Sequence, residues 1–218
     1  MSWFPEPHAR IFCAAVNYRD HRAEMGRGEE GPHPMLFLRT PRSLAPAGAP
    51  LLRPAQSERF DWEGELAAII GTAGRNVPRE RALDLVGAWA PFMDGSVRDW
   101  QRHTAQFTPG KNFDASGSIG DAPVSAAEWG DYRGRKLETR VNGEVVQSTD
   151  TSLMIHDVET LIEYITVFTE LLPGDIIATG TCGGVGDKLS PPRYLKPGDV
   201  VEVAVTGLPT LSNPVAQA

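Results

Sequence analysis

The chain has 218 residues, a formal net charge of −7 and a hydrophobic fraction of 41%, a composition that fits one large globular domain. The acidic balance argues against nucleic acid or an anionic membrane as the main partner, and no apolar run approaches the roughly 18 residues that span a bilayer. The start of the chain lacks the basic and apolar segments of a signal peptide, and Cys13 and Cys182 are too few for a disulfide framework. We therefore expect a cytoplasmic protein in which both cysteines are small buried residues.

The 22 glycines and 18 prolines predict many short strands joined by tight turns. The predicted strands are Ile11–Val16, Met35–Leu38, Leu66–Ile70, Ala88–Met93, Lys136–Val141, Val145–Gln147, Asp175–Thr179 and Val200–Val205. Asn142-Gly143 predicts a type I′ hairpin turn between two of them.

Helical periodicity predicts helices over Arg79–Val86, over Val97–Gln106 behind a Ser96 cap, and over Asp157–Phe168. The segment Gly26–Pro34 and the proline-rich tail after Gly207 are predicted to be mobile surface.

A polar cluster follows the first predicted strand. On a helical turn, His21 and Glu24 are neighbours, and a carboxylate there orients the imidazole and raises its basicity, as a general base requires. The spacing also suits a metal site, although zinc motifs need a further His and the next residue is Met25. An ordinary surface helix is the third interpretation that the spacing leaves open.

Three carboxylates at alternate positions precede the strand 66–70. In an extended chain the side chains of Asp61, Glu63 and Glu65 point the same way, and like charges on one face repel one another. A hard divalent cation such as Mg2+ would relieve the repulsion, because it prefers carboxylate oxygen. The alternative is a solvated edge face without a ligand.

The next predicted strand ends at Asp94, which can offer a third carboxylate to such a cation. Arg98 and Gln101 lie one turn apart on the helix predicted after it and can face an anionic ligand. Lys111 stands in a glycine-marked loop, where a lone Lys is usually only solvated.

Glycines after the strand 175–179 predict a loop around Thr181 whose backbone N–H groups can approach an anion. The segment Asp187–Pro192 that follows cannot begin a helix cleanly, so a dinucleotide-binding fold is rejected.

Taken in order, these segments resemble the fumarylacetoacetate hydrolase family, and in particular its small bacterial type, similar to fumarylpyruvate and acylpyruvate hydrolases. The matching stretches are Asn17-Tyr18-x-x-His21-x-x-Glu24, Asp61-x-Glu63-x-Glu65-Leu66, Asp94-x-Ser96-x-Arg98-Asp99-x-Gln101, Gly110-Lys111-x-Phe113-Asp114, Val141-Asn142-Gly143-Glu144, Gln147, and Leu172-Pro173-Gly174-Asp175-Ile176-Ile177-x-Thr179-Gly180-Thr181. The resemblance covers residues 10–207, and its collinear motifs are together far more specific than any one of them.

The resemblance implies a strand-dominated α+β fold, a mixed β-sandwich roll with a few flanking helices, in one catalytic domain over residues 1–218. It also implies a homodimer and one Mg2+ or Mn2+ ion. The implied metal ligands are Glu63, Glu65 and Asp94, with Asp61 in a supporting role. The implied catalytic residues are His21 and Glu24 on a lid, and Lys111; the implied substrate contacts are Tyr18, Arg98, Gln101 and Thr181.

For the family's chemistry, the resemblance implies a metal that chelates a 2-oxo acid and stabilises its enolate. We expect first a hydrolase that cleaves a C–C bond in a 2,4-diketo acid such as fumarylpyruvate, with His21 activating the water and pyruvate as one product. The same residues would serve the decarboxylation of oxaloacetate-like acids or the isomerisation of a hydroxydienoate. A metal-stabilised binding protein without turnover is a further alternative, against which the intact His21–Glu24 pair argues.

Some positions depart from the family pattern. Arg39 stands where Lys is usual, which keeps the charge but changes its geometry, so substrate preference or a supporting ion pair would differ. Met93 replaces an Asn, Cys182 replaces a Pro, and Gly120-Asp121 replaces Gly-Pro. None of these changes removes a predicted metal ligand.

Overall fold

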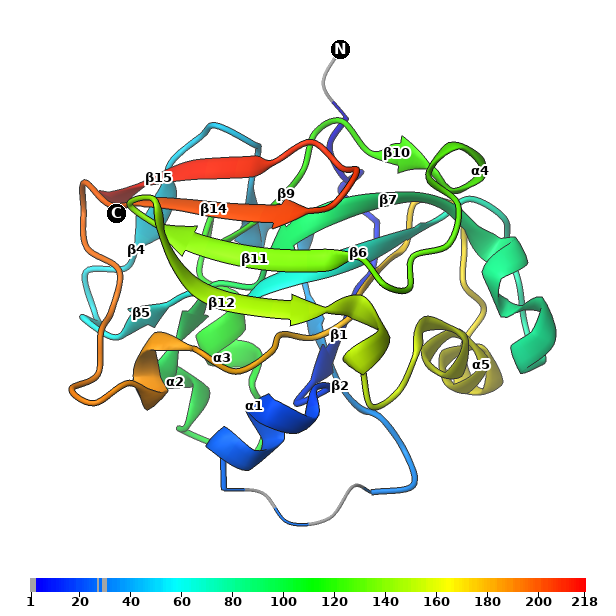
Figure 1. Ribbon diagram of the computed structural model, residues 1–218, viewed down its shortest axis with the longest axis horizontal. Helices are drawn as coiled ribbons and strands as arrows, with labels where there is room; N and C mark the ends of the chain where they lie inside the picture. Colours follow the sequence, from blue (N-terminus) through cyan, green and yellow to red (C-terminus); the bar gives the residue numbers. More distant parts are fainter. Residues whose placement is uncertain (1–2, 27, 29–30) are drawn as a thin grey trace.

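A large mixed sheet runs through the centre of the protein (Figure 1). The computed structural model describes residues 3–26, 28 and 31–218. The strands of this eight-stranded sheet, in spatial order, are β2 (Met35–Arg39), β1 (Ile11–Ala15), β13 (Ile176–Ala178), β6 (Gly64–Ile70), β7 (Val86–Met93), β9 (Gly117–Ile119) and β3 (Leu44–Ala45), with β10 (Val124–Ser125) paired to β7. The fold is therefore the strand-dominated α+β type that the sequence predicts.

A second, five-stranded sheet packs against the first. Its strands, in spatial order, are β12 (Glu144–Asp150), β11 (Lys136–Val141), β14 (Val200–Val205), β15 (Leu211–Gln217) and β4 (Leu51–Arg53). A two-stranded ribbon of β5 (Phe60–Asp61) and β8 (Ser96–Val97) lies beside them.

The helices are short except for one. They are α1 (Arg19–Glu24), α2 (Arg98–Gln101), α3 (Thr108–Lys111), α4 (Ala126–Trp129) and α5 (Val158–Phe168), with 3-10 turns η1 (Pro41–Ser43), η2 (Arg79–Leu85), η3 (Thr151–Leu153) and η4 (Gly186–Lys188). Among the described residues, no helix has the length and apolar character needed to cross a membrane.

Both faces of β6, in the interior of the larger sheet, are buried. On β6, Leu66 and Ile70 enter a core cluster shared with α5 and the smaller sheet, whereas Ala67 and Ile69 enter a second cluster. The second cluster also holds Leu44 of β3, so the sheet curls around it. In a strand that is buried on both faces, apolar side chains do not alternate with polar ones. This explains the unbroken apolar run of residues 66–70.

The pairing of β6 with β7 positions the polar residues at one end of the large sheet. The two strands are antiparallel, with Gly64 opposite Met93, so the start of β6 lies beside the end of β7. The Asp94 N–H donates to the Glu63 carbonyl oxygen at 2.9 Å. The helices α1, α2 and α3 gather near this end (Figure 1).

Most predicted elements form close to their expected bounds. All eight predicted strands are present, and the 142–143 turn has positive φ at both positions, 54° at Asn142 and 81° at Gly143, as a type I′ turn requires. The segment predicted as a helix over 79–86 is the 3-10 turn η2, and Val86 already begins β7.

Two expectations are wrong. The helix predicted over Val97–Gln106 is confined to Arg98–Gln101: its start is displaced because Ser96 and Val97 form β8, which pairs with β5, and it already ends at Gln101. The tail after Gly207, predicted to be mobile surface, forms β15 between β14 and β4, with buried side chains at 211, 213 and 215. The other segment predicted to be mobile, Gly26–Pro34, lies partly outside the described residues.

Candidate metal centre and active site

Three buried carboxylates converge where β6 begins and β7 ends. Glu63, Glu65 and Asp94, called the carboxylate cluster below, each offer an oxygen atom, and these atoms lie within 4.8 Å of one another. The sequence separates Asp94 from the two glutamates by about thirty positions, and the antiparallel register of β6 and β7 brings it back. The structure therefore assembles the three residues predicted as metal ligands.

Glu65 is the member of the cluster without a cationic partner among the described residues. Its Oε2 accepts the Gly180 N–H at 2.8 Å, and only a glycine fits there, because Gly180 has φ +94° and an added Cβ would lie 2.7 Å from the Asn17 Cβ. Burial, together with the neighbouring Asp94 and Glu63 carboxylates, raises the pKa of Glu65 well above its usual range. Its environment therefore calls for additional positive charge.

Lys111, on α3, bridges the other two carboxylates. Its Nζ lies 2.7 Å from Glu63 Oε2 and 2.5 Å from Asp94 Oδ2. Burial alone would lower the pKa of Lys111, but the Asp94 and Glu63 carboxylates outweigh it and raise the pKa. The ammonium thus remains charged and holds two of the predicted metal ligands.

Arg98, at the start of α2, is fixed by two carboxylates. Its Nε donates to Asp61 Oδ2 at 2.8 Å, and its Nη1 lies 2.6 Å from Glu63 Oε1. Asp61 also accepts the backbone N–H groups of Gly186 at 2.8 Å and Asp187 at 3.0 Å. Asp61 is therefore committed to Arg98 and to the η4 turn, and it is not one of the three carboxylates that converge as candidate metal ligands.

The contacts of Arg39 account for an arginine at the position where the family usually has Lys. Its Nη1 lies 2.6 Å from Asp94 Oδ1, and its other N–H groups donate to Ser43 Oγ at 3.1 Å and Ser116 Oγ at 2.8 Å. The side chain is buried on β2. A lysine could not make all of these bonds at once, so the altered ion pair expected at this position is present and supports Asp94.

The donor set fits a divalent cation. Four buried carboxyl groups face three buried cationic side chains, and Glu65 is the carboxyl group that none of these cations bonds; the seven residues are Asp61, Glu63, Glu65, Asp94, Arg39, Arg98 and Lys111. Clustered carboxylate oxygens are the ligands that Mg2+ and Mn2+ prefer. The cluster can therefore hold a divalent metal ion.

His21 and Glu24 meet on α1, as predicted. His21 Nδ1 lies 3.1 Å from Glu24 Oε2, while Glu24 Oε1 accepts the Gly184 N–H at 3.0 Å. When Nδ1 donates to the carboxylate, Nε2 is the nitrogen that can accept a proton. Glu24 thus orients the imidazole and also ties α1 to the loop that follows β13.

A cavity of about 190 Å3 lies beside the carboxylate cluster. Its lining residues are Ala14, Ala15, Val16, His21, Met25, Phe37, Glu63, Arg98, Gln101, Arg102, Phe107, Lys111 and Thr181. Drug-sized ligands occupy pockets of roughly 300–1,000 Å3, so this cavity suits a small molecule. The Arg98 Nη2 is buried and has no hydrogen-bond partner among the described residues, which leaves a donor for a ligand.

Gln101 and Thr181 also reach the cavity. The Gln101 Oε1 accepts from Arg98 Nη1 at 3.0 Å. The Thr181 hydroxyl donates to the Gly64 carbonyl oxygen at 3.0 Å and accepts from Gln147 Nε2 at 2.8 Å. Both side chains are thus held in place by their neighbours.

Tyr18 is the predicted substrate contact that the structure does not bring to the cavity. Its side chain belongs to the hydrophobic core, and its hydroxyl is buried without a hydrogen-bond partner in the described part of the chain. Its position directly before α1 made it a neighbour of His21 in the sequence but not in the cavity lining.

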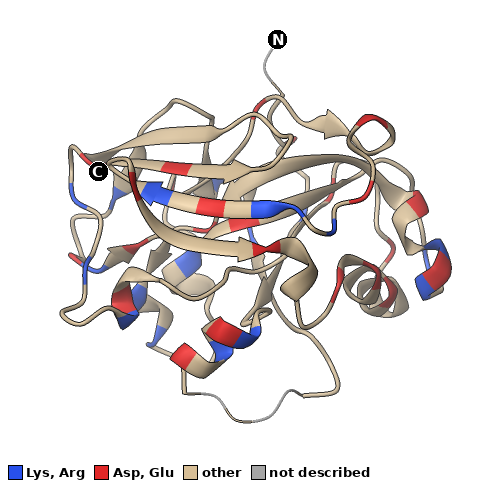
Figure 2. Cartoon of the chain, in the orientation of Figure 1, with Lys and Arg blue, Asp and Glu red and all other residues tan. Residues whose placement is uncertain are grey.

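Sequence reasoning missed several lining residues. Phe37 lies in an apolar strand, and Phe107 and Arg102 lie in a segment that carried no motif. No local pattern distinguishes these side chains from core or surface residues. The mixture of charges near the cavity is visible in Figure 2, where α1, α2 and η4 carry acidic and basic residues side by side.

The chain is similar to known proteins over most of its length. A family model described as fumarylacetoacetate (FAA) hydrolase C-terminal matches residues 10–216. The oxaloacetate tautomerase YisK of Bacillus subtilis (strain 168) is 38% identical over 213 residues, which is 97% of this chain and 71% of that protein.

Two solved structures resemble the chain over nearly its whole length. The 5-carboxymethyl-2-hydroxymuconate delta-isomerase from Mycobacterium smegmatis has 34% identity and a TM-score of 0.87, covering 100% of this chain and 82% of that one. The fumarylpyruvate hydrolase from Pseudomonas aeruginosa, in complex with Mn2+ and pyruvate, has 32% identity and a TM-score of 0.87, covering 96% of this chain and 90% of that one. The chain therefore belongs to the fumarylacetoacetate hydrolase family.

Proposed function

We propose that the protein is a divalent-metal-dependent enzyme that interconverts the enol and keto forms of a small 2-oxo acid such as oxaloacetate. The observation that carries the proposal is one small cavity lined by both a member of the carboxylate cluster, Glu63, and an oriented imidazole, His21. A tautomerase needs only proton transfer next to a stabilised enolate, and a single His–Glu pair supplies it. The relative named oxaloacetate tautomerase supports this choice over the hydrolase expected first.

Glu63, Glu65 and Asp94 would hold the ion, Mg2+ or Mn2+. When bound there, the cation supplies Lewis-acid stabilisation of the negative charge that develops on a 2-oxo group. Lys111 keeps Glu63 and Asp94 in place, and its ammonium, with the Gln101 amide, adds stabilisation for a developing oxyanion.

His21 would carry the proton. Its Nε2 accepts a proton from the substrate carbon or oxygen and returns it at the other position, while Glu24 on Nδ1 stabilises the imidazolium that forms. The unpartnered Nη2 of Arg98 would bind the carboxylate of the 2-oxo acid. A hydrogen bond from the Thr181 hydroxyl to that carboxylate would require the hydroxyl to release the Gly64 carbonyl oxygen.

A second candidate is hydrolysis of an acylpyruvate such as fumarylpyruvate. The structural likeness to a fumarylpyruvate hydrolase that matches nearly end to end favours it. In that reaction His21 would deprotonate a water that attacks the distal carbonyl, and C–C cleavage would release pyruvate and a carboxylic acid.

The deciding experiment incubates the purified protein with Mg2+ or Mn2+ and oxaloacetate, acetylpyruvate, fumarylpyruvate or hydroxymuconate-type acids. Ultraviolet absorbance follows enol decay, and NMR identifies the products. Faster enol loss from oxaloacetate without release of pyruvate supports the tautomerase. Pyruvate together with a carboxylic acid from an acylpyruvate supports the hydrolase, and no metal-dependent change in any substrate rejects both.

His21→Asn tests the proton carrier. We expect a loss of at least about 10²-fold in kcat with metal binding nearly unchanged, because the imidazole is not a member of the carboxylate cluster. His8→Asn is the matched control, since His8 is exposed and does not line the cavity. Equal activity of the His21 variant and the wild type would remove His21 from the mechanism.

We also propose that the protein is a homodimer, as the family resemblance implies. Exposed apolar side chains at the end of α5 support this, because Val167 is 61% exposed and Phe168 is 54% exposed. Sedimentation of the purified protein at micromolar concentration distinguishes a dimer from a monomer.

A further inference from the structure

Arg102 differs from the other cationic side chains that line the cavity. Arg98 and Lys111 are each only 2% exposed and are bonded to Glu63, whereas the Arg102 side chain is 47% exposed and makes no contact with the carboxylate cluster. It follows α2 directly and lies close enough to the cavity to line it. The Arg102 guanidinium therefore forms no ion pair with the predicted metal ligands.

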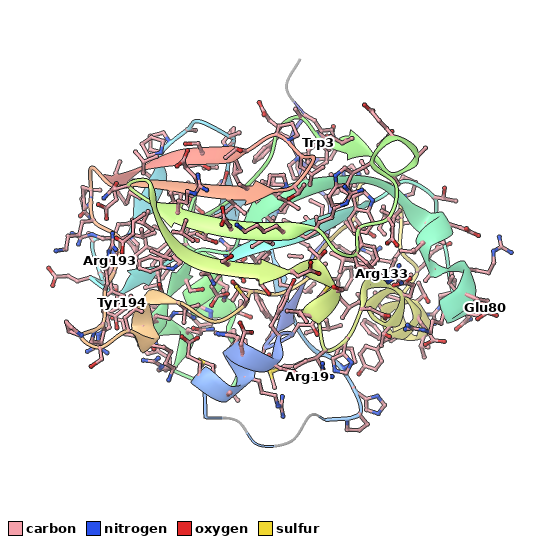
Figure 3. All side chains as sticks on the ribbon, viewed as in Figure 1. Trp3, Arg19, Glu80, Arg133, Arg193 and Tyr194 are labelled. Carbon is pink, nitrogen blue, oxygen red and sulfur yellow. The ribbon has the colours of Figure 1, made fainter. Side chains whose placement is uncertain are left out.

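A neighbouring turn holds Arg102 in place. The Arg102 Nη2 is bonded to Asp187 Oδ2, and Asp187 Oδ1 accepts the Tyr194 hydroxyl at 2.8 Å. Tyr194 lies in the segment after η4. Figure 3 labels it next to Arg193 at the edge of the molecule. No other partner of the Arg102 side chain lies among the described residues, so its Nε and Nη1 groups remain available as donors.

Arg102 stands at the mouth of the cavity. A shallower hollow outside, called the outer groove here, shares Met25 and Arg102 with the cavity lining; its other residues are Arg59, Asp187, Lys188, Pro192 and Tyr194. The carboxylate-cluster side of the cavity is lined by Glu63 and Lys111. A ligand that extends from there toward the outer groove passes the apolar side chains of the lining and reaches a guanidinium.

We infer that Arg102 binds a second carboxylate of the substrate, remote from the 2-oxo acid end, and so selects dicarboxylic 2-oxo acids. The inference rests on the proposed function for the position of the 2-oxo acid end. A guanidinium with two free donor groups recognises a carboxylate through charge-assisted hydrogen bonds. The small cavity limits the distance between the two ends, which favours a short diacid over a long one.

The overall charge makes a local cation necessary. The chain carries a net charge of −7 and therefore repels a dianion at long range. Arg59 and Lys188 in the outer groove add positive charge near the mouth, so general attraction is the competing explanation for any effect of Arg102. The experiment must separate a direct contact from this attraction.

The test compares two substrates that differ only at the far end: oxaloacetate and its 4-methyl ester, both with the Mn2+-loaded protein. For Arg102→Gln we expect KM for oxaloacetate to rise about tenfold or more, while KM for the ester stays within about twofold. Arg102→Lys keeps the positive charge but lacks the planar guanidinium group. Its KM for oxaloacetate should therefore lie between those of the wild type and Arg102→Gln. An equal effect of Arg102→Gln on both substrates would overturn the inference.

Arg59→Gln is the matched control, because it removes the same charge from the outer groove without touching the cavity lining. Its KM values should stay close to those of the wild type at 0.15 M salt. If it weakens oxaloacetate as much as Arg102→Gln does, and if both losses vanish at high salt, general attraction is the cause and the inference fails.

Binding provides a readout that does not depend on turnover. Calorimetric titration of the Mn2+-loaded wild type with freshly dissolved oxaloacetate and with the ester should show tighter binding of the diacid, and Arg102→Gln should abolish the difference. If the wild type binds the diacid selectively but turns over no 2-oxo acid, the proposed function fails and the inference stands. If it turns over oxaloacetate but binds the diacid and the ester equally well, the inference fails and the proposed function stands.

Discussion

Single side chains set the charge balance around the carboxylate cluster. Glu63 is bonded to Arg98 and Lys111, and Asp94 to Arg39 and Lys111, whereas Glu65 receives one backbone N–H. Two of the three carboxylates thus have structural partners that persist without a metal. Replacement of the Glu65 carboxylate should therefore weaken metal binding without lowering the stability of the fold.

Glu65→Gln should separate metal binding from folding. The amide keeps an acceptor for the Gly180 N–H and can add no negative charge to the buried cluster, so the metal-free variant should be at least as stable as the wild type. Its activity should fall at least about 10²-fold, and its affinity for Mn2+ should fall with it. Activity assays and metal titration measure both effects.

Glu63→Gln is the informative comparison, because it leaves Arg98 and Lys111 without one of their partners. We expect a loss of about 3 kcal/mol in the metal-free free energy of unfolding. Full activity of Glu65→Gln in the presence of a strong chelator would contradict the assignment of the metal site.

The polar residues of the cluster were predictable because each stands in a sequence pattern that states its chemistry. Glu63 and Glu65 alternate on the approach to a strand, and His21 and Glu24 have helical spacing. Arg102 was not predictable, since one arginine after a short helix looks like any surface residue until the fold places Asp187 beside it. Tyr18 shows the converse, because its place in a motif suggested a substrate contact, whereas its side chain packs in the hydrophobic core and does not line the cavity.

Among the elements, α5 is stabilised by a charged cap. Asp157 Oδ1 accepts the Thr160 N–H at 3.0 Å and lies 2.6 Å from Arg79 Nη1. Burial alone would raise the pKa of Asp157, but the bonds from Arg79 and Thr160 outweigh it and lower the pKa to about 2, from 3.8. The carboxylate therefore stabilises the folded chain above about pH 4, and this contribution is lost as the pH falls toward 2.

Asp157→Ala should cost about 1 kcal/mol at pH 7, measured by urea denaturation. The difference from the wild type should shrink at pH 3, because part of the wild-type contribution is already lost there. Glu80→Ala, at an exposed position on η2, serves as the control and should change little at either pH. A difference that grows on acidification would contradict the cap.

A close contact between the two sheets depends on Gly64. A Cβ added at Gly64 would lie 1.9 Å from Thr139 Oγ1 and 3.2 Å from Thr139 Cβ. Gly64→Ala should therefore lower the free energy of unfolding by about 2 kcal/mol or more. Adding Thr139→Ala should recover part of the loss, and thermal melts of both single variants and the double variant measure the coupling. Additive effects would show that the contact is not the cause.

The long strands were predictable from apolar runs and turn residues, but the shortest ones were not. Strands β3, β5, β8 and β10 have two residues each, too few for any periodicity. The prolines and small residues of the tail concealed β15, although Leu211, Asn213 and Val215 alternate with more exposed residues as a strand requires.

The proposed metal ion should stabilise the whole fold as a bound ligand. An ion bound only by the folded chain stabilises it by about 2.7 kcal/mol at a concentration 100 times its Kd. For a chain of this length, that corresponds to a rise in Tm of roughly 5–10 °C. Scanning calorimetry with Mn2+ and then with excess EDTA measures the shift, and Glu65→Gln should show little of it.

The order of the strands was beyond reach of the sequence, apart from the hairpin at 142–143. Strand β1 pairs with β13 in parallel, with Ile11 opposite Ile176. Strand pairings so distant in the chain leave no local pattern. Only the resemblance to a known family implied the curled architecture, and the family model and the solved structures confirm it.

The parallel pairing of β4 with β15 has a consequence for how the polypeptide is made. Leu51 is opposite Val215, so β4 finds its ladder partner only after about 160 further residues have been synthesised. Loop closure over such a span is costly, and folds rich in distant pairings form slowly. During synthesis the 51–53 segment therefore stays without its sheet partner until β15 has emerged, and we expect this pairing to form late in folding.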